Sequence, residues 1–540
     1  MRTTIHDPDL FRLFENTYPN TLDTMIKWHG YANKTNETTM EDTMTDEELT
    51  YIITGDIDAM WLRDSAAQMQ SYSNLLVADI DTTGYNNETT LARLWRGLIN
   101  LQARYVLTSP YCHSFQPPRE SGIPPTRNPA HSQNHPFPGY DRELVFDCKW
   151  ELDSLASFLQ ISATYFEKTA DVAFFSHHSW LDAVEAAVNA AAAMRLGMYD
   201  EEGHVLNSAY TFTGWTDRGT ETLNNFGLGN PSRANGMVRT SFRPSDDATV
   251  FQFLVPANMM WAASLERASN IMDLLSRQVL GTRFTQQTRA ENLTTVMRDF
   301  ATGIREGIAS DAIVQHRVFG DIFAYEVDGY GSVNLMDDAN IPSLLSIPLL
   351  GFLDGNTQVT NERQDGKEGE ERRATVGHAA NHGAEAEIAG SHEALKHQPL
   401  RDYADIYANT RRFVLSKANP YFAWGEPGGF AAVGGPHMGP GKAWPMASIV
   451  TALTMYRYVD DNDTNTDKRD RVVSRQLSML LNSTWGTGVM HESIDTWSPQ
   501  IWTRPWFGWA NGLFGELILA IAEDDKKRSE DERLLNRSWQ

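Results

Sequence analysis

The chain has 540 residues, of which 41% are hydrophobic and 11% aromatic, and its formal net charge at pH 7 is −24. This acidic balance argues against a nucleic-acid or anionic-membrane partner, because both need a basic surface. No apolar run is long enough to span a bilayer. We expect a soluble protein that acts on a neutral substrate, and its fifteen Trp suit sugar rings as well as a large core.

Cysteines and glycosylation sequons bear on the compartment. Cys112 and Cys148 are the only cysteines, and either one disulfide or two buried free thiols would fit them. N-x-[ST] sequons occur at Asn33, Asn36, Asn87, Asn292, Asn462, Asn482 and Asn536. This number favours a secreted glycoprotein. A cytoplasmic protein is the alternative, since Met1–Asp9 lacks the apolar core of a signal peptide.

Apolar residues recur at helical spacing along most of the chain. The pattern predicts helices over residues 9–30, 66–76, 91–107, 150–168, 179–195, 249–275, 289–309, 400–415, 447–459, 469–481 and 506–522. Loops are expected over 33–48, 109–140 and 214–243, and a short hairpin over 318–334.

These segments amount to about a dozen helices in pairs, separated by loops that carry acidic and aromatic residues. Such a series predicts an all-α fold, an (α/α)6 barrel whose loops meet over a central cavity. A helical solenoid is the alternative, but the sequence has no fixed-period repeat. Residues 356–398 are charged and nearly free of large apolar side chains, so we expect a surface insertion within one domain spanning 1–540.

The segment TGDIDAMWLRDS, residues 54–65, is unusually rich in polar groups. It contains Asp56, Asp58, Arg63 and Asp64 around Trp61. An indole can stack on the C–H face of a pyranose while carboxylates and a guanidinium bind its hydroxyls. A solvated helix start, with acids near the positive end of the helix dipole, is the competing interpretation.

Two further motifs carry carboxylates that suit acid–base chemistry. In SFRPSDDA, Ser245 is a candidate helix N-cap, which would place Asp246 and Asp247 in a first helical turn. Alternatively, one of the two points into the cavity and is held protonated by burial and its neighbour's charge. In MHES, Glu492 is either a general base or a surface residue. The sequence has no HExxH or CxxC motif, so we expect no metal site.

Other stretches combine acids or amides with aromatic residues. They are KWELDS (149–154), MDDANIPSLL (336–345), ANPYFAWGEPGG (418–429) and the glycine-rich GGPHMGPGK (434–442). Each is compatible with a sugar site, although singly each is more often structural.

With these motifs in order, the chain resembles glycoside hydrolase family 125, the metal-independent exo-α-1,6-mannosidases. The resemblance rests on GDIDAMWLRDS, KWELDS, RPSDDA, MDDANIPSLL, GGPH…GKAWPM, MHES and TRPWFGWAN…FGELIL. It implies an (α/α)6 barrel, an inverting mechanism without metal or cofactor, and a mannose-containing oligosaccharide as substrate. The insertion at 356–398 departs from compact members of the family.

By motif, the resemblance assigns the general acid to the Asp246–Asp247 pair, with Asp247 favoured, and the general base to Glu492. Asp56, Asp58, Trp61, Arg63 and Asp64 are expected to hold the terminal mannose. Further substrate contacts are expected from Arg243, Asp338, Trp424, His437, His491 and Arg504. We expect a monomer. The alternatives are a mannan-binding barrel without activity, or a glucoamylase- or trehalase-like hydrolase.

Overall fold

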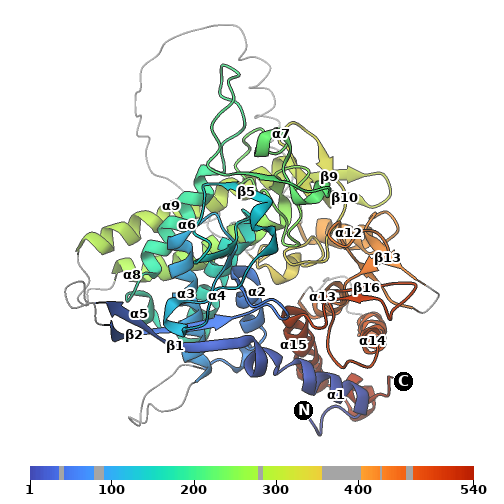
Figure 1. Ribbon diagram of the computed structural model, residues 1–540. Helices are drawn as coiled ribbons and strands as arrows, with labels where there is room; N and C mark the ends of the chain where they lie inside the picture. Colours follow the sequence, from blue (N-terminus) through green and yellow to red (C-terminus); the bar gives the residue numbers. More distant parts are fainter. Residues whose placement is uncertain are drawn as a thin grey trace, which may run out of the picture.

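The computed structural model describes residues 1–35, 42–77, 90–277, 284–354, 403–425, 429–457 and 466–539. Most of its regular structure is helical (Figure 1). The α-helices are α1 (Pro8–Thr17), α2 (Leu62–Gln70), α3 (Leu91–Thr108), α4 (Leu152–Thr169), α5 (Val172–Phe175), α6 (Trp180–Ala193), α7 (Asn224–Gly227), α8 (Val255–Arg277), α9 (Phe284–Asp311), α12 (Tyr403–Val414), α13 (Pro445–Arg457), α14 (Thr466–Ser483) and α15 (Gly508–Asp525).

The helices with the clearest apolar periodicity lie where the sequence predicts them. In α3, Trp95, Leu98 and Ile99 are fully buried, and the Thr90 side chain caps the helix by accepting the N–H of Arg93. The predicted helices over 150–168, 179–195 and 289–309 correspond to α4, α6 and α9. Periodicity succeeds here because each helix buries one face against its neighbours.

The predicted helix over 9–30 and the predicted loop over 33–48 are wrong beyond Thr17. Helix α1 ends at Thr17, and the strands β1 (Ile26–Thr35) and β2 (Asp42–Ile52) pair antiparallel as the β1–β2 hairpin. Strand β2 packs on α3, and a Cβ at Gly97 would lie 2.4 Å from Thr50 Oγ1. The strand conformation at the buried end of β2 therefore depends on contact with α3, and the spacing of apolar residues within β2 does not show this contact.

The remaining strands are short and form small antiparallel sheets. They are β3 (Met60–Trp61), β4 (Ser114–Phe115), β5 (Asn134–Phe137), β6 (Val145–Asp147), β7 (Thr211–Gly214), β8 (Phe253–Leu254), β9 (Ile313–His316), β10 (Gly320–Phe323), β11 (Glu326–Val327), β12 (Val333–Asn334), β13 (Phe422–Trp424), β14 (Ala431–Val433), β15 (Lys442–Ala443), β16 (Ser493–Asp495) and β17 (Trp502–Thr503). Sheets β3–β4–β6 and β15–β16–β17 carry loops that reach the candidate site.

The helices pack in a continuous series. Helix α2 packs on α4, α4 on α8, α13 on α15, and α15 on α2. Between α8 and α13 lies the 3₁₀ turn Ile347–Leu349, which contacts α13, while a Cβ at Gly351 would lie 3.8 Å from Ala263 of α8. Helices α3, α6, α9 and α14 pack outside this series. Among the described residues, no helix is both long and apolar enough to cross a membrane.

The predicted surface insertion, residues 356–398, lies outside the described residues.

Candidate active site

The aspartate loop, residues 241–249, is irregular rather than the predicted helix start. Its turn is closed by hydrogen bonds from Arg243 N–H to the Asp247 carbonyl (2.7 Å) and from Asp246 N–H to the Arg243 carbonyl (2.9 Å). Helix α8 begins only at Val255. Ser245 caps no helix, because none begins at the next residues, and its hydroxyl donates to Asp338 Oδ2 at 2.7 Å. Tertiary contacts therefore override the local capping pattern.

Two buried carboxylates, Glu326 and Asp338, hold this loop through hydrogen bonds. Arg243 Nε donates to Glu326 Oε1 at 2.6 Å, and both side chains are almost fully buried. The Asp338 carboxylate, which accepts the Ser245 hydroxyl, is also buried, and burial raises its pKa to about 6. The predicted substrate residues Arg243 and Asp338 are thus placed as supports of the loop.

Asp246 is held by a histidine and a lysine. The Lys149 backbone N–H donates to His113 Nδ1 at 3.1 Å, so the proton of a neutral His113 is on Nε2. That nitrogen lies 3.1 Å from Asp246 Oδ1 and donates to it. The Lys149 ammonium bonds the Asp246 carbonyl at 2.8 Å. Burial opposes ionisation, yet Lys149, His113 and Arg63 hold the pKa of Asp246 well below its usual value.

A disulfide joins the two segments that grip Asp246. Cys112 and Cys148 are bonded, which resolves the two alternatives left open by the sequence. The bond immediately precedes both His113 and Lys149. It therefore fixes the spacing of these two residues, and with it the position of Asp246.

Replacing both Cys112 and Cys148 by Ser is expected to lower both stability and turnover. The bond closes a separation of 36 residues, and a disulfide of this kind contributes about 2–4 kcal/mol to stability. Thermal unfolding and kcat would be measured on the same preparation. A variant with reduced melting temperature but wild-type kcat at low temperature would contradict the positioning role.

Asp247 is the deeper member of the pair. Its side chain is 2% exposed, and its Oδ2 lies 3.4 Å from His437 Nδ1. Burial lowers the pKa of His437, but the hydrogen-bonding and charge of Asp247, together with the charges of Glu492 and Asp246, raise it to about 9. One imidazole is thus within electrostatic reach of all three sequence-predicted catalytic carboxylates.

Glu492 enters the site from the segment before β16. Arg504 Nε lies 3.9 Å from Glu492 Oε1, and Arg504 Nη1 lies 3.2 Å from Asp56 Oδ2. Arg504 therefore links Glu492 to the first acid of the TGDIDAMWLRDS segment. The structure brings these residues together although more than 400 positions separate them in the chain.

His491 holds Arg504 through its backbone. The His491 ring stacks on Trp502 with centroids 4.2 Å apart, and its Nδ1 lies 3.0 Å from the Arg504 carbonyl. Arg504 has a φ of +58°, which is uncommon for a residue with a side chain. His491 is fully buried, so the structure places it as a support of the Arg504 turn.

Arg63 and Asp64 lie beneath Asp246 in a buried charge cluster. Arg63 Nη1 donates to Glu151 Oε2 at 2.5 Å and to Asp153 Oδ2 at 3.0 Å. Burial raises the pKa of both Glu151 and Asp153, and it raises that of Asp64 to about 6. Several carboxylates thus share one guanidinium, an arrangement that favours retaining a proton.

Trp61 packs beside His113, which holds Asp246. Its ring packs edge-on against His113, with centroids 5.7 Å apart, and against Phe146 at 5.4 Å. The side chain is buried, so it reaches the site mainly through its packing on His113.

Two predicted site residues do not join the others. Asp58 points to the surface, where its carboxylate is 62% exposed and lies 3.2 Å from Lys27 Nζ. Trp424 of β13 is exposed, and the ammonium of Lys417 lies 4.6 Å from its ring centroid. Glu426 lies outside the described residues.

Sequence reasoning missed the residues that hold Asp246 and Arg243. His113 lies in the long loop predicted over 109–140, and its only sequence signal is its position beside Cys112. Lys149 and Glu151 belong to the recognised KWELDS stretch but carried no assigned role. Glu326 lies within the predicted hairpin over 318–334 and was assigned no role.

The donor chemistry at Asp246 does not suit a metal ion. His113, Glu151 and Asp246 offer ligand atoms within 4.8 Å of one another. However, Arg63 and Lys149 already supply positive charge to the same carboxylates. A cation there would be repelled by both side chains.

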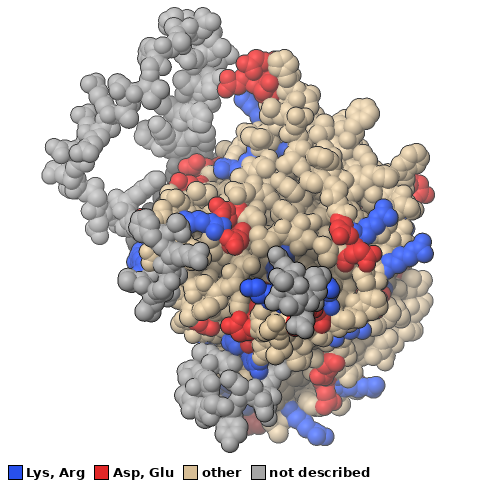
Figure 2. Space-filling model, turned by 60° about the vertical axis from the view of Figure 1, so that its left-hand side comes forward, with Lys and Arg blue, Asp and Glu red and all other residues tan. Residues whose placement is uncertain are grey.

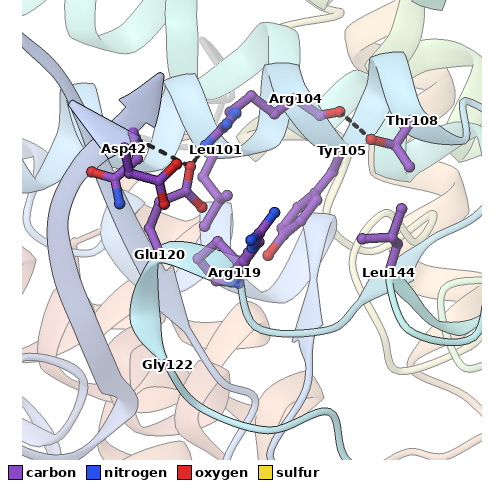
Figure 3. Close-up of a pocket in the computed structure, with 11 residues that line it drawn as sticks. Asp42, Leu101, Arg104, Tyr105, Thr108, Arg119, Glu120, Gly122 and Leu144 are labelled. Atoms are coloured by element: carbon purple, nitrogen blue, oxygen red, sulfur yellow. Dashed lines mark hydrogen bonds and ion pairs between the residues drawn. The ribbon is translucent and has the colours of Figure 1, made fainter. Parts of the chain in front are cut away.

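A separate cavity of about 420 Å³ lies between the β1–β2 hairpin and α3 (Figure 3). Arg104 and Glu120 form an ion pair at 2.9 Å on its wall, next to Tyr105. None of the sequence-predicted site residues lines it, so it is distinct from the carboxylate cluster.

Comparison with known proteins places the chain in a family. The chain is 38% identical over 522 residues to the Meiotically up-regulated gene 157 protein of Schizosaccharomyces pombe, covering 96% of this chain and 83% of that protein. A solved structure of a metal-independent alpha mannosidase from Streptococcus pneumoniae, in a non-productive complex with alpha-1,6-mannobiose, matches with a TM-score of 0.68 and 27% identity. The match covers 96% of this chain and 94% of that one. Residues 7–519 match the family described as metal-independent alpha-mannosidase (GH125), and the chain therefore belongs to this family of glycoside hydrolases.

Proposed function

We propose that this protein is an inverting exo-α-1,6-mannosidase in which Asp247 is the general acid and Glu492 the general base. The single observation that carries the proposal is the environment of His437. Its imidazole contacts Asp247 at 3.4 Å, and its pKa responds to Glu492 as well. Two carboxylates from distant motifs therefore face one site, as an acid–base mechanism requires.

The surroundings of the aspartate pair favour Asp247 over Asp246. Lys149, His113 and Arg63 keep Asp246 ionised, so it has no proton to donate. His437 Nδ1 lies 3.4 Å from Asp247 Oδ2, and its raised pKa of about 9 keeps the imidazole protonated at neutral pH. His437 can therefore supply the proton that Asp247 passes to the glycosidic oxygen.

The proposed reaction is a single displacement. Asp247 Oδ2 donates its proton to the glycosidic oxygen as the bond from that oxygen to C1 of mannose breaks. A water molecule attacks C1 from the opposite face while Glu492 takes its proton. An inverting enzyme needs about 6.5–9.5 Å between the two carboxyl groups, which leaves room for this water. The products are β-mannose and a shortened oligosaccharide.

The exo specificity and the barrel are part of the same proposal. Helices α2, α4, α8, α13 and α15, with the segment around the Ile347–Leu349 turn, form a series of contacts that returns to its start. This supports an inner ring of an (α/α)6 barrel. Asp56 shares the Arg504 guanidinium with Glu492, and we assign it to the terminal sugar. The printed description of the Streptococcus pneumoniae complex, with alpha-1,6-mannobiose, supports the linkage.

The test is hydrolysis of α-1,6-mannobiose beside the α-1,2- and α-1,3-linked isomers, with NMR following the anomer released first. We expect selective cleavage of the α-1,6 isomer with β-mannose as first product. Release of α-mannose would mean a retaining mechanism. Cleavage of none of the three, with retained binding, would support a mannan-binding barrel instead.

We further propose that the protein is monomeric and follows the secretory pathway. The Cys112–Cys148 bond suits an oxidising compartment. Among the sequons in the described residues, Asn33, Asn292 and Asn482 are exposed. Acidic and basic side chains are interspersed over the face in Figure 2, without a broad basic patch for nucleic acid. A mass decrease of the natively produced protein on endoglycosidase treatment would test the localisation.

A further inference from the structure

The ribbon of β5 and β7 carries aromatic side chains that the core does not use. Trp215, which follows β7, is 79% exposed, Phe137 of β5 is 61% exposed, and Phe226 of α7 is 99% exposed. A Cβ at Gly227 would lie 3.0 Å from Phe212 of β7, so α7 packs on the same ribbon. Figure 1 shows β5 and α7 on one side of the molecule. Large aromatic rings contribute most when they are covered, so a cluster of exposed ones suits a binding surface.

Two hydrogen bonds connect this ribbon and the turn after it to segments near Asp246 and Asp247. The Ala248 N–H, directly after Asp247, donates to the Thr220 carbonyl at 2.7 Å. On the other side, Asn134 of β5 donates to Asp147 Oδ1 at 3.2 Å, next to the Cys148–Lys149 segment. The ribbon therefore borders the aspartate loop.

The turn that presents Trp215 is held in place by its own hydrogen bonds. The Trp215 N–H donates to the Gln133 carbonyl at 2.9 Å, and the Gly214 N–H donates to Thr222 Oγ1 at 2.9 Å. The Thr216 hydroxyl bonds Glu221 Oε2 at 3.0 Å. These bonds fix the backbone on both sides of Trp215, so its exposed indole is presented from a defined position, as a stacking platform requires.

Reaction geometry indicates which part of the substrate lies here. The general acid protonates the oxygen between the terminal mannose and the rest of the oligosaccharide, so the leaving sugar lies on the side of Asp247. Other exposed tryptophans are Trp424 of β13 and Trp497 after β16, and Lys417 already covers a face of Trp424.

We propose that Trp215 forms the leaving-group subsite, where its indole stacks on the pyranose ring that follows the terminal mannose. This inference rests on the proposed function, and it names the residue that makes an oligosaccharide a better substrate than a simple mannoside.

The test compares Trp215→Ala with wild type on α-1,6-mannobiose and on α-mannosyl fluoride. The fluoride has no leaving sugar and needs no stacking platform. We expect kcat/KM for mannobiose to fall about tenfold, mostly through KM, while the value for the fluoride stays within twofold of wild type. Trp485→Ala is the matched control, since Trp485 is 61% exposed beyond α14, and it should change neither value.

The outcomes separate this inference from the function beneath it. Wild-type protein that hydrolyses neither substrate would refute the proposed function. An active wild type with an unchanged Trp215→Ala variant would refute only the subsite. An equal loss on both substrates would also overturn it, since that loss would report damage to the aspartate loop. If Trp497→Ala, and not Trp215→Ala, lost the preference for mannobiose, the leaving sugar would lie at Trp497 after β16.

Discussion

Replacing Asp247 by Asn is expected to lower kcat/KM for α-1,6-mannobiose by roughly 10³-fold while costing much less on α-mannosyl fluoride. General acid catalysis contributes about 10²–10⁴-fold when the leaving group needs a proton. An alkoxide leaving group needs one, whereas fluoride leaves readily without it. Steady-state kinetics on the two substrates check the prediction directly.

Asp246→Asn is the matched control for the neighbouring residue. It leaves Lys149 and Arg63 beside a neutral amide, so an electrostatic partner of both is lost. We expect losses of similar size on both substrates and a lower melting temperature. If Asp246→Asn spared the fluoride and Asp247→Asn did not, the two roles would be exchanged.

The acid assignment also fixes the sign of the alkaline pH dependence. The pKa of His437 is raised from 6.5 to about 9, so the imidazolium that supplies the proton to Asp247 persists at neutral pH and is lost as pH rises through about 9. For wild type, kcat/KM on mannobiose should therefore decline through this range. The fluoride should show no such decline. A His437→Asn variant with the same alkaline decline would show that another group controls it.

The helices were predictable because each buries one apolar stripe. The β1–β2 hairpin was not, since the burial of Tyr51 and Leu49 depends on α3, which follows it in the chain. Asp58 shows the same limit within the site segment. Its partner Lys27 lies in β1, where the apolar spacing predicts a helix and not a strand.

The candidate site was predictable to the extent that its motifs are local. Asp246, Asp247 and Glu492 were recognisable as paired or motif-borne acids. Whether Asp246 or Asp247 carries the proton depends on His113, Lys149 and His437, which come from three distant segments. The predicted N-cap at Ser245 is wrong because residues 241–249 close into an irregular turn and α8 begins only at Val255.

Replacing Glu492 by Gln is expected to abolish hydrolysis of both substrates, with losses of roughly 10³-fold or more on each. Gln keeps the shape of the side chain and its reach toward Arg504 but cannot accept a proton from water. Because water must be activated whatever group leaves, the rate on the fluoride should fall as much as the rate on mannobiose. The contrast with Asp247→Asn therefore separates base from acid within one pair of assays.

Glu120→Gln provides the matched control for that experiment. Glu120 pairs with Arg104 beside the separate cavity of Figure 3, away from the carboxylate cluster, so the variant should retain wild-type rates. If Glu492→Gln kept fluoride hydrolysis within tenfold of wild type, Glu492 would not be the base. Asp56, joined to Glu492 through Arg504, would then be the next carboxylate to test, because it is the nearest described acid on the same guanidinium.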